Sequence, residues 1–143
     1  MKYTLEIEID QPREKVIELF DNPENMQHWQ PGFLSLEPIS GTPGEVGAQS
    51  RLKYKMGKRD IEMVETITVR NLPDEFSGTY ETTGVWNEVK NLFSESGDSK
   101  TKWISHVDFQ LSGFMKIIAF LMPGSFKKQS FKYMELFKAF AEK

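Results

Sequence analysis

Apolar and polar residues alternate with a period of two along most of the chain, and this pattern predicts β-strands. The residues from Tyr3 to Ile9 show it first, with apolar side chains at every second position and Thr or Glu between them. Six further runs follow, and short turn-rich segments containing Gly, Pro, Asn or Asp separate them, as expected for antiparallel hairpins. These six predicted strands are Phe33 to Ile39, Ala48 to Met56, Asp60 to Asn71, Glu75 to Thr83, Val85 to Ser94 and Thr101 to Leu111.

Two short helices are predicted between the first and second strands. Arg13 to Phe20 has its apolar residues on one stripe, and Asp10 is a candidate cap ahead of Pro12, which stands near the first helical position. Glu24 to Gln30 forms the second helix. Together the two helices predict a V-shaped clasp at one end of the sheet.

The end of the chain changes to a helical period. On a helical wheel started at Phe126, one arc is apolar and the opposite side carries Lys and Glu, so an amphipathic helix is predicted. The preceding segment, Phe114 to Met122, is apolar on nearly every side except at Lys116, and we expect more than one of its faces to be covered. Pro123-Gly124 predicts a kink or a break between the two segments. The alternative to a buried, kinked helix is an edge that enters lipid or opens as a gate.

This order of elements predicts an α+β fold. Sequential antiparallel strands followed by one long helix favour a curved, seven-stranded antiparallel sheet that grips a long, kinked C-terminal helix. At 143 residues, without repeats or linkers, the chain is expected to form a single domain spanning 1–143.

Composition and charge narrow the possible classes of function and location. The formal net charge is −3, which does not favour nucleic acid, and the absence of Cys excludes thiolate chemistry and disulfides. The N-terminus lacks the apolar core of a signal peptide, and the segment before Pro123 is too short to span a bilayer, so we expect a cytoplasmic protein without stable membrane insertion. Eleven Phe residues either fill a thick core or line an apolar cavity.

Three polar residues fall on strand faces that are otherwise apolar: Glu65, Asn87 and Asn91. In a solid core each would need a partner or would cost on the order of a few kcal/mol. A cavity with apolar walls accepts such groups, and small-molecule sites are built in this way. The alternative is that the strands slip or bulge, so that each polar group reaches solvent.

Candidate chemistry is sparse. A buried Glu65 would have a raised pKa and would suit a general base, and Tyr80 would then donate to a developing oxyanion; the alternative is an ordinary ion pair. His106 and Asp108 share a strand face and could form a weak metal site, but alternation places that face outside. His28, next to Trp29, is either a residue of the cavity mouth or a lone exposed His. We therefore expect no metal site and no cofactor.

Two stretches resemble a known superfamily. IDQPREKVIELFDNPENMQHWQPG resembles the opening of START/Bet v1-like (SRPBCC) proteins, in particular the polyketide cyclase/dehydrase and lipid-transport group, and MELFKAFAEK resembles their terminal helix. The resemblance covers nearly the whole chain and implies a helix-grip fold with an internal cavity between sheet and terminal helix.

The resemblance also implies ligand-binding positions. The mouth of the cavity would involve Trp29, Phe33, Met122 and Phe126, although Trp29 alternatively packs the small helices onto the sheet. The interior would be lined by Met63, Glu65, Tyr80, Asn87, Asn91, Phe109, Tyr133, Met134 and Phe137.

Three functions remain open from the sequence. The first is a carrier or sensor of an apolar or amphipathic small molecule, such as a lipid or a polyketide. The second is a cyclase, dehydratase or hydrolase that uses Glu65 as general base. The third is a partner-binding module, because relatives in the superfamily include co-chaperones. The sequence does not predict an oligomeric state.

Overall fold

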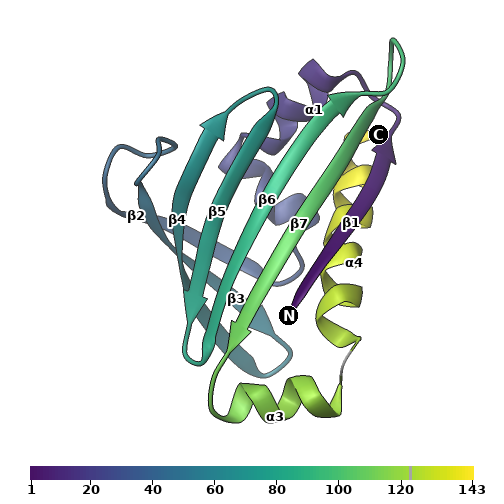
Figure 1. Ribbon diagram of the computed structural model, residues 1–143. Helices are drawn as coiled ribbons and strands as arrows, with labels where there is room; N and C mark the ends of the chain where they lie inside the picture. The colour runs from purple at the N-terminus through teal and green to yellow at the C-terminus, as the bar shows by residue number, and fades with distance from the viewer. Residues whose placement is uncertain (123) are drawn as a thin grey trace.

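The fold is built on one β-sheet (Figure 1). The computed structural model describes residues 1–122 and 124–143. The seven strands of the sheet are all antiparallel to their neighbours, in the order β1-β7-β6-β5-β4-β3-β2. Strands β2 to β7 follow chain order, and β1 adds to the far edge by pairing with β7. The strands are β1 (Lys2–Ile9), β2 (Phe33–Ser40), β3 (Gln49–Met56), β4 (Arg59–Asn71), β5 (Glu75–Thr82), β6 (Val85–Glu95) and β7 (Thr101–Leu111).

The helices lie on one face of the sheet and beyond its lower end. They are α1 (Arg13–Phe20), a 3-10 turn η1 (Pro23–Asn25), α2 (Met26–Trp29), α3 (Phe114–Leu121) and α4 (Ser125–Ala141). This confirms the α+β helix-grip architecture. The second small helix is shorter than predicted, because η1 takes up its first turn. Asp10 is not a helix cap: Pro12 occupies that position, and the Asp10 amide instead donates to Glu142 Oε2 at 2.7 Å.

An aromatic core joins α4 to the sheet and to the small helices. Phe137 is fully buried, and its ring centroid lies 5.1 Å from Trp29, 5.4 Å from Trp103 and 5.8 Å from Phe20. Phe20 also contacts Phe93 at 5.0 Å. Such edge-to-face arrangements add about 1 kcal/mol per pair beyond the area that they bury. One end of the inner face of the sheet is therefore tightly packed.

A bulge in β4 corrects one expected side-chain orientation. Alternation predicts that Arg70 lies on the outer face, but the register shifts between Ile67 and Val69 and places Arg70 opposite Phe76. From there its guanidinium donates two hydrogen bonds to Asp21 just after α1, at 2.8 and 2.7 Å. The bulge thus ties the sheet to the clasp.

The segment before Pro123 also differs from expectation. Pro123 itself lies outside the described residues, and α3 and α4 are separate helices on either side of it. Figure 1 shows α3 beyond the lower ends of the strands and crosswise to α4. It has no buried residue, and Phe120 is 85% exposed, so the expectation that several of its faces are covered is wrong. The reason is its position beyond the ends of the strands, where Met115 lies near Gly84 of the β5–β6 turn (Figure 1).

Candidate functional site

A row of side chains crosses the inner face of the sheet. The strand registers place Ser50 opposite Glu65, Glu65 opposite Tyr80, Tyr80 opposite Asn87, and Asn87 opposite Phe109. Directly opposed residues in antiparallel strands project to the same face. Period-two alternation along five strands therefore gathers the predicted Glu65, Tyr80 and Asn87 into one line.

The part of the row on β4 and β5 is less tightly covered than the aromatic core. Helix α4 packs mainly against β1, α1 and α2 rather than against β3, β4 or β5. Met63, Glu65 and Tyr80 accordingly keep part of their surface accessible, whereas the core around Phe137 does not. The inner face is thus divided into a filled half and a half that is open in part.

The Glu65 carboxyl is held in an apolar setting. Desolvation raises its pKa, and hydrogen bonding with Tyr80 offsets this only in part. The pKa of Tyr80 is raised as well, first by desolvation and then by the charge of Glu65. An enclosed carboxyl with a raised pKa and a neutral hydroxyl donor next to it can exchange a proton with a bound molecule, or anchor one polar group of it.

Two residues that the sequence did not single out complete this cluster. Tyr54 projects from β3, and burial, followed by the nearby Tyr133 and Glu65, raises its pKa. Its hydroxyl donates to Gln30 Oε1 at 2.5 Å. Tyr54 was recognisable as an inward position by alternation, but Gln30 lies after α2 in a segment without periodicity.

A cleft of about 590 Å³ opens between the first half of α4 and the near end of β3. Tyr133 belongs both to this cleft and to the tyrosines around Glu65, so the cleft lies next to the row. We call it the α4 cleft, and it is lined by Pro31, Met56, Ser125, Lys128, Gln129, Phe131, Lys132, Tyr133 and Glu135. Its volume suits a small organic molecule.

The two asparagines differ in their hydrogen bonding. Asn91 is buried, and its Oδ1 accepts a hydrogen bond from Trp103 Nε1 at 3.0 Å, so it is a satisfied core residue. Asn87 Oδ1 is buried without a partner among residues 1–122 and 124–143. An unpaired buried acceptor next to Tyr80 is a polar group available to a ligand or to water.

Several predicted ligand positions belong instead to the packed core. Phe137, Met134 and Asn91 are at most 6% exposed and have no surface to offer a ligand in this conformation. Trp29 is not at a mouth: it is buried between Phe20, Trp103 and Phe137, which is the alternative considered from the sequence. Its indole N–H has no partner within the described part of the chain.

The remaining predicted positions lie outside the core around Phe137. Phe109 and Phe126 pack together at 5.0 Å, and Phe126 accepts a hydrogen bond from Tyr3 at its carbonyl oxygen, so the pair joins β7 to α4. Phe33 contacts Tyr54 edge to face at 5.8 Å. Met122 is 56% exposed after α3. For these residues, as for Met63, ligand contact stays a prediction.

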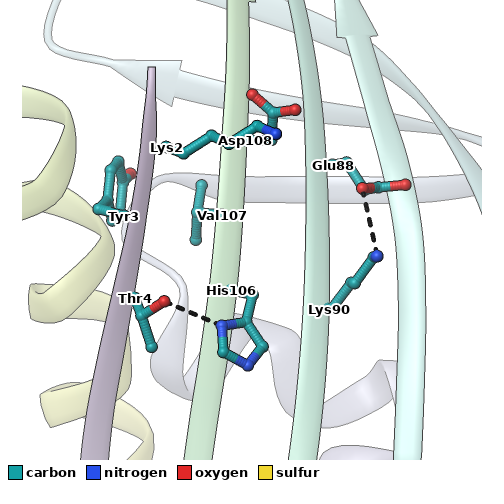
Figure 2. Close-up of a pocket in the computed structure, with 8 residues that line it drawn as sticks. All are labelled: Lys2, Tyr3, Thr4, Glu88, Lys90, His106, Val107 and Asp108. Atoms are coloured by element: carbon teal, nitrogen blue, oxygen red, sulfur yellow. Dashed lines mark hydrogen bonds and ion pairs between the residues drawn. The ribbon is translucent and has the colours of Figure 1, made fainter.

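A second, smaller depression of about 310 Å³ lies along β1, β7 and β6 (Figure 2). Figure 2 shows His106 hydrogen-bonded to Thr4, at 2.9 Å between Nδ1 and Oγ1, while Asp108 lies away from it near Lys2. Within the described residues, no group of three or more His, Cys, Asp or Glu side chains is placed to hold a metal ion. The α4 cleft is the better candidate site, because it is larger and shares Tyr133 with the cluster around Glu65.

Comparison with known proteins identifies the class. Residues 1–130 match the family described as Polyketide cyclase / dehydrase and lipid transport, and the chain belongs to this family. No curated protein sequence matches the chain significantly. Across the described residues, no helix is long and apolar enough to cross a membrane.

Solved structures show the same fold at low sequence identity. A conserved protein from Geobacillus kaustophilus superposes with a TM-score of 0.82 at 15% identity, covering 99% of this chain and 95% of that one. The Zhui aromatase/cyclase from a Streptomyces species gives 0.81 at 10% identity, with coverages of 99% and 93%. Norcoclaurine synthase from Thalictrum flavum, in complex with dopamine and hydroxybenzaldehyde, gives 0.69 at 16% identity, with coverages of 98% and 85%.

Proposed function

We propose that the protein binds an apolar or amphipathic small molecule in the α4 cleft and acts as its carrier or sensor. The observation that carries the proposal is the division of the inner face. One half is sealed by aromatic packing, and the other keeps Glu65 and Tyr80 partly accessible beside a cleft of about 590 Å³. Small-molecule sites usually have apolar walls with a few polar groups.

The family match supports this proposal, because its description includes lipid transport. Two proteins of the same fold have names that point to small organic molecules, an aromatase/cyclase and a synthase bound to dopamine and hydroxybenzaldehyde. In our proposal the apolar body of the ligand lies against Phe131 and Tyr133, and one polar group reaches Glu65, Tyr80 or Asn87.

The test combines native mass spectrometry with a binding titration. The protein purified from cells should carry a small molecule, and it should bind the fluorescent probe 1-anilinonaphthalene-8-sulfonate. Gln129→Trp places a large side chain in the cleft and should weaken the probe by about tenfold or more, equivalent to about 1.4 kcal/mol. Ala139→Trp, on the same helix at an exposed position outside the cleft lining, is the matched control. Equal probe affinity in both variants contradicts the site.

A second candidate function rests on the raised pKa of Glu65. In the enzyme hypothesis Glu65 takes a proton from a bound substrate, and Tyr80 donates to the oxygen that becomes negative. With a substrate found by screening, Glu65→Gln should then remove turnover and leave probe binding in place. A variant that turns over as fast as the wild type rejects this function and leaves the carrier proposal intact.

A further inference from the structure

Helix α3 presents an apolar surface that the fold leaves uncovered. Its outward side carries Phe114, Ile117, Phe120 and Leu121, which are 68%, 56%, 85% and 69% exposed. The opposite side is only partly exposed, and Met115 lies against the β5–β6 turn, since a Cβ on Gly84 would lie 3.1 Å from Met115 Cγ. The helix is therefore fixed to the molecule along one side with its apolar side turned outward.

The charged residues in and just after α3 are all basic along the sequence. Between Phe109 and Met134 the sequence has four Lys and no Asp or Glu, although the net charge of the whole chain is −3. Three of these lysines, Lys127, Lys128 and Lys132, are exposed in the first half of α4, directly after α3. Lys116 is exposed on α3 itself.

The fold brings a second basic segment to the same region. Lys58 is in the β3–β4 turn, and Arg59, the first residue of β4, pairs with Met56 in the hairpin. Met56 lines the α4 cleft together with Lys128 and Lys132. Asp60, the next residue of β4, is acidic, and its carboxylate lies 3.7 Å from Lys55 Nζ. Basic side chains from two distant parts of the sequence thus lie around the α4 cleft, on the helix that directly follows α3.

We propose that α3 and these basic residues dock the protein onto the surface of an anionic lipid bilayer. An apolar helix side that enters the headgroup boundary, with lysines reaching the lipid charges, is the pattern of an interfacial helix. A helix of eight residues is far too short to span the bilayer and lies in its surface. A second copy of this chain fits less well, because it would bring two lysine-rich surfaces together.

Docking at this position would place the α4 cleft next to the membrane, since Lys128 and Lys132 belong to both surfaces. This consequence rests on the proposed function, and an apolar ligand could then pass between lipid and cleft without crossing water. The docking itself does not depend on a ligand. The two proposals are tested separately, because vesicle binding is measured without ligand and probe binding without vesicles.

The experiment is flotation of the full chain with two kinds of vesicle, one of phosphatidylcholine alone and one that also contains phosphatidylserine. The protein should float with the second kind, and added salt should weaken the association. Ile117→Ser/Phe120→Ser should reduce the partition coefficient by about tenfold or more, because it removes most of the inserted apolar area. Lys127→Gln/Lys128→Gln should reduce it roughly tenfold, because each lysine near an anionic surface contributes several-fold.

Controls use exposed apolar and exposed basic residues elsewhere on the molecule. Ile39→Ser/Val46→Ser changes two exposed apolar residues in and after β2, and Lys15→Gln/Lys100→Gln changes two exposed lysines. Both should float like the wild type, and all variants should keep the wild-type circular dichroism spectrum because the changed side chains are exposed. Failure of the wild type to float, or equal flotation with both vesicles, overturns the proposal. So does light scattering that shows a dimer dissociated by Ile117→Ser/Phe120→Ser without any vesicle binding.

Discussion

At the scale of single residues, Glu65 is an ionisable group whose charged form is disfavoured on the inner face. Its carboxyl lies among tyrosines, and desolvation raises its pKa above the ordinary value of 4.5. The folded protein therefore holds a proton on Glu65 at a pH where the unfolded chain has lost it. Stability from this group is fully present below the unfolded pKa and is lost as the pH rises through the raised folded pKa.

Glu65→Gln should remove this pH dependence. At neutral pH the variant should be more stable than the wild type by about 1 kcal/mol, because an imperfectly paired buried carboxylate is replaced by a neutral amide. Below the ordinary carboxylate pKa of 4.5 the difference should vanish. Urea unfolding of both proteins across this pH range measures it, and parallel stability curves would contradict the assigned environment.

Single residues also show how well period-two alternation predicts the direction of a side chain. It correctly places Glu65, Tyr80, Asn87 and Phe109 on one face, because side-chain direction in a regular strand depends only on parity. It is wrong for Arg70, since one bulged residue reverses the parity of all that follow. It does not reveal that Asn91 is satisfied by Trp103, which depends on two strands meeting at that register.

At the scale of elements, α3 depends on a small contact area. Gly84 in the β5–β6 turn has a φ of +77°, and its carbonyl oxygen accepts a hydrogen bond from Ser112 just before the helix. A side chain at Gly84 would meet both Met115 and the Ser112 carbonyl oxygen, at 3.1 and 3.2 Å. The position of α3 is thus linked to the absence of a side chain at one turn residue.

Gly84→Ala should consequently cost more than the same change in a comparable turn. Gly57 in the β3–β4 turn has a φ of +64° and open space around its Cα, so Gly57→Ala should lose only about 1 kcal/mol from the left-handed backbone. Gly84→Ala should lose that amount and also displace α3, which should speed tryptic cleavage at Lys116. Equal stability and equal cleavage in the two variants would show that α3 does not rest on this turn.

The two C-terminal segments had equally clear patterns but opposite outcomes. The amphipathic pattern from Phe126 correctly predicts α4, whose buried residues are Met134, Phe137 and Ala141. The apolar segment before Pro123 predicts burial, and α3 is instead exposed. A periodic pattern tells which side of a helix is apolar, whereas the position of the helix beyond the strands decides whether anything covers that side.

At the scale of the whole molecule, folding stability and membrane docking should depend on different residues. The core around Phe137 is buried, whereas the apolar side of α3 is exposed. Phe137→Ala should destabilise the protein by about 3–5 kcal/mol, since it leaves a cavity among Trp29, Trp103 and Phe20. Phe120→Ala should change the free energy of unfolding by less than about 0.5 kcal/mol, because the side chain is 85% exposed. Denaturant unfolding of the two variants measures the contrast, and a large loss at Phe120 would mean that α3 is covered in solution.

Local sequence patterns are enough to predict the elements, their order and the α+β helix-grip class, because strand and helix periods, turn residues and hairpin lengths are local properties. Tertiary structure decided the rest: the pairing of β1 with β7, the bulge that turns Arg70 towards Asp21, and the division of the inner face. It also brought Lys58 and Arg59 near the lysines of α4 and left α3 uncovered. These features depend on which distant segments meet, and a local pattern of hydrophobicity carries no information about that.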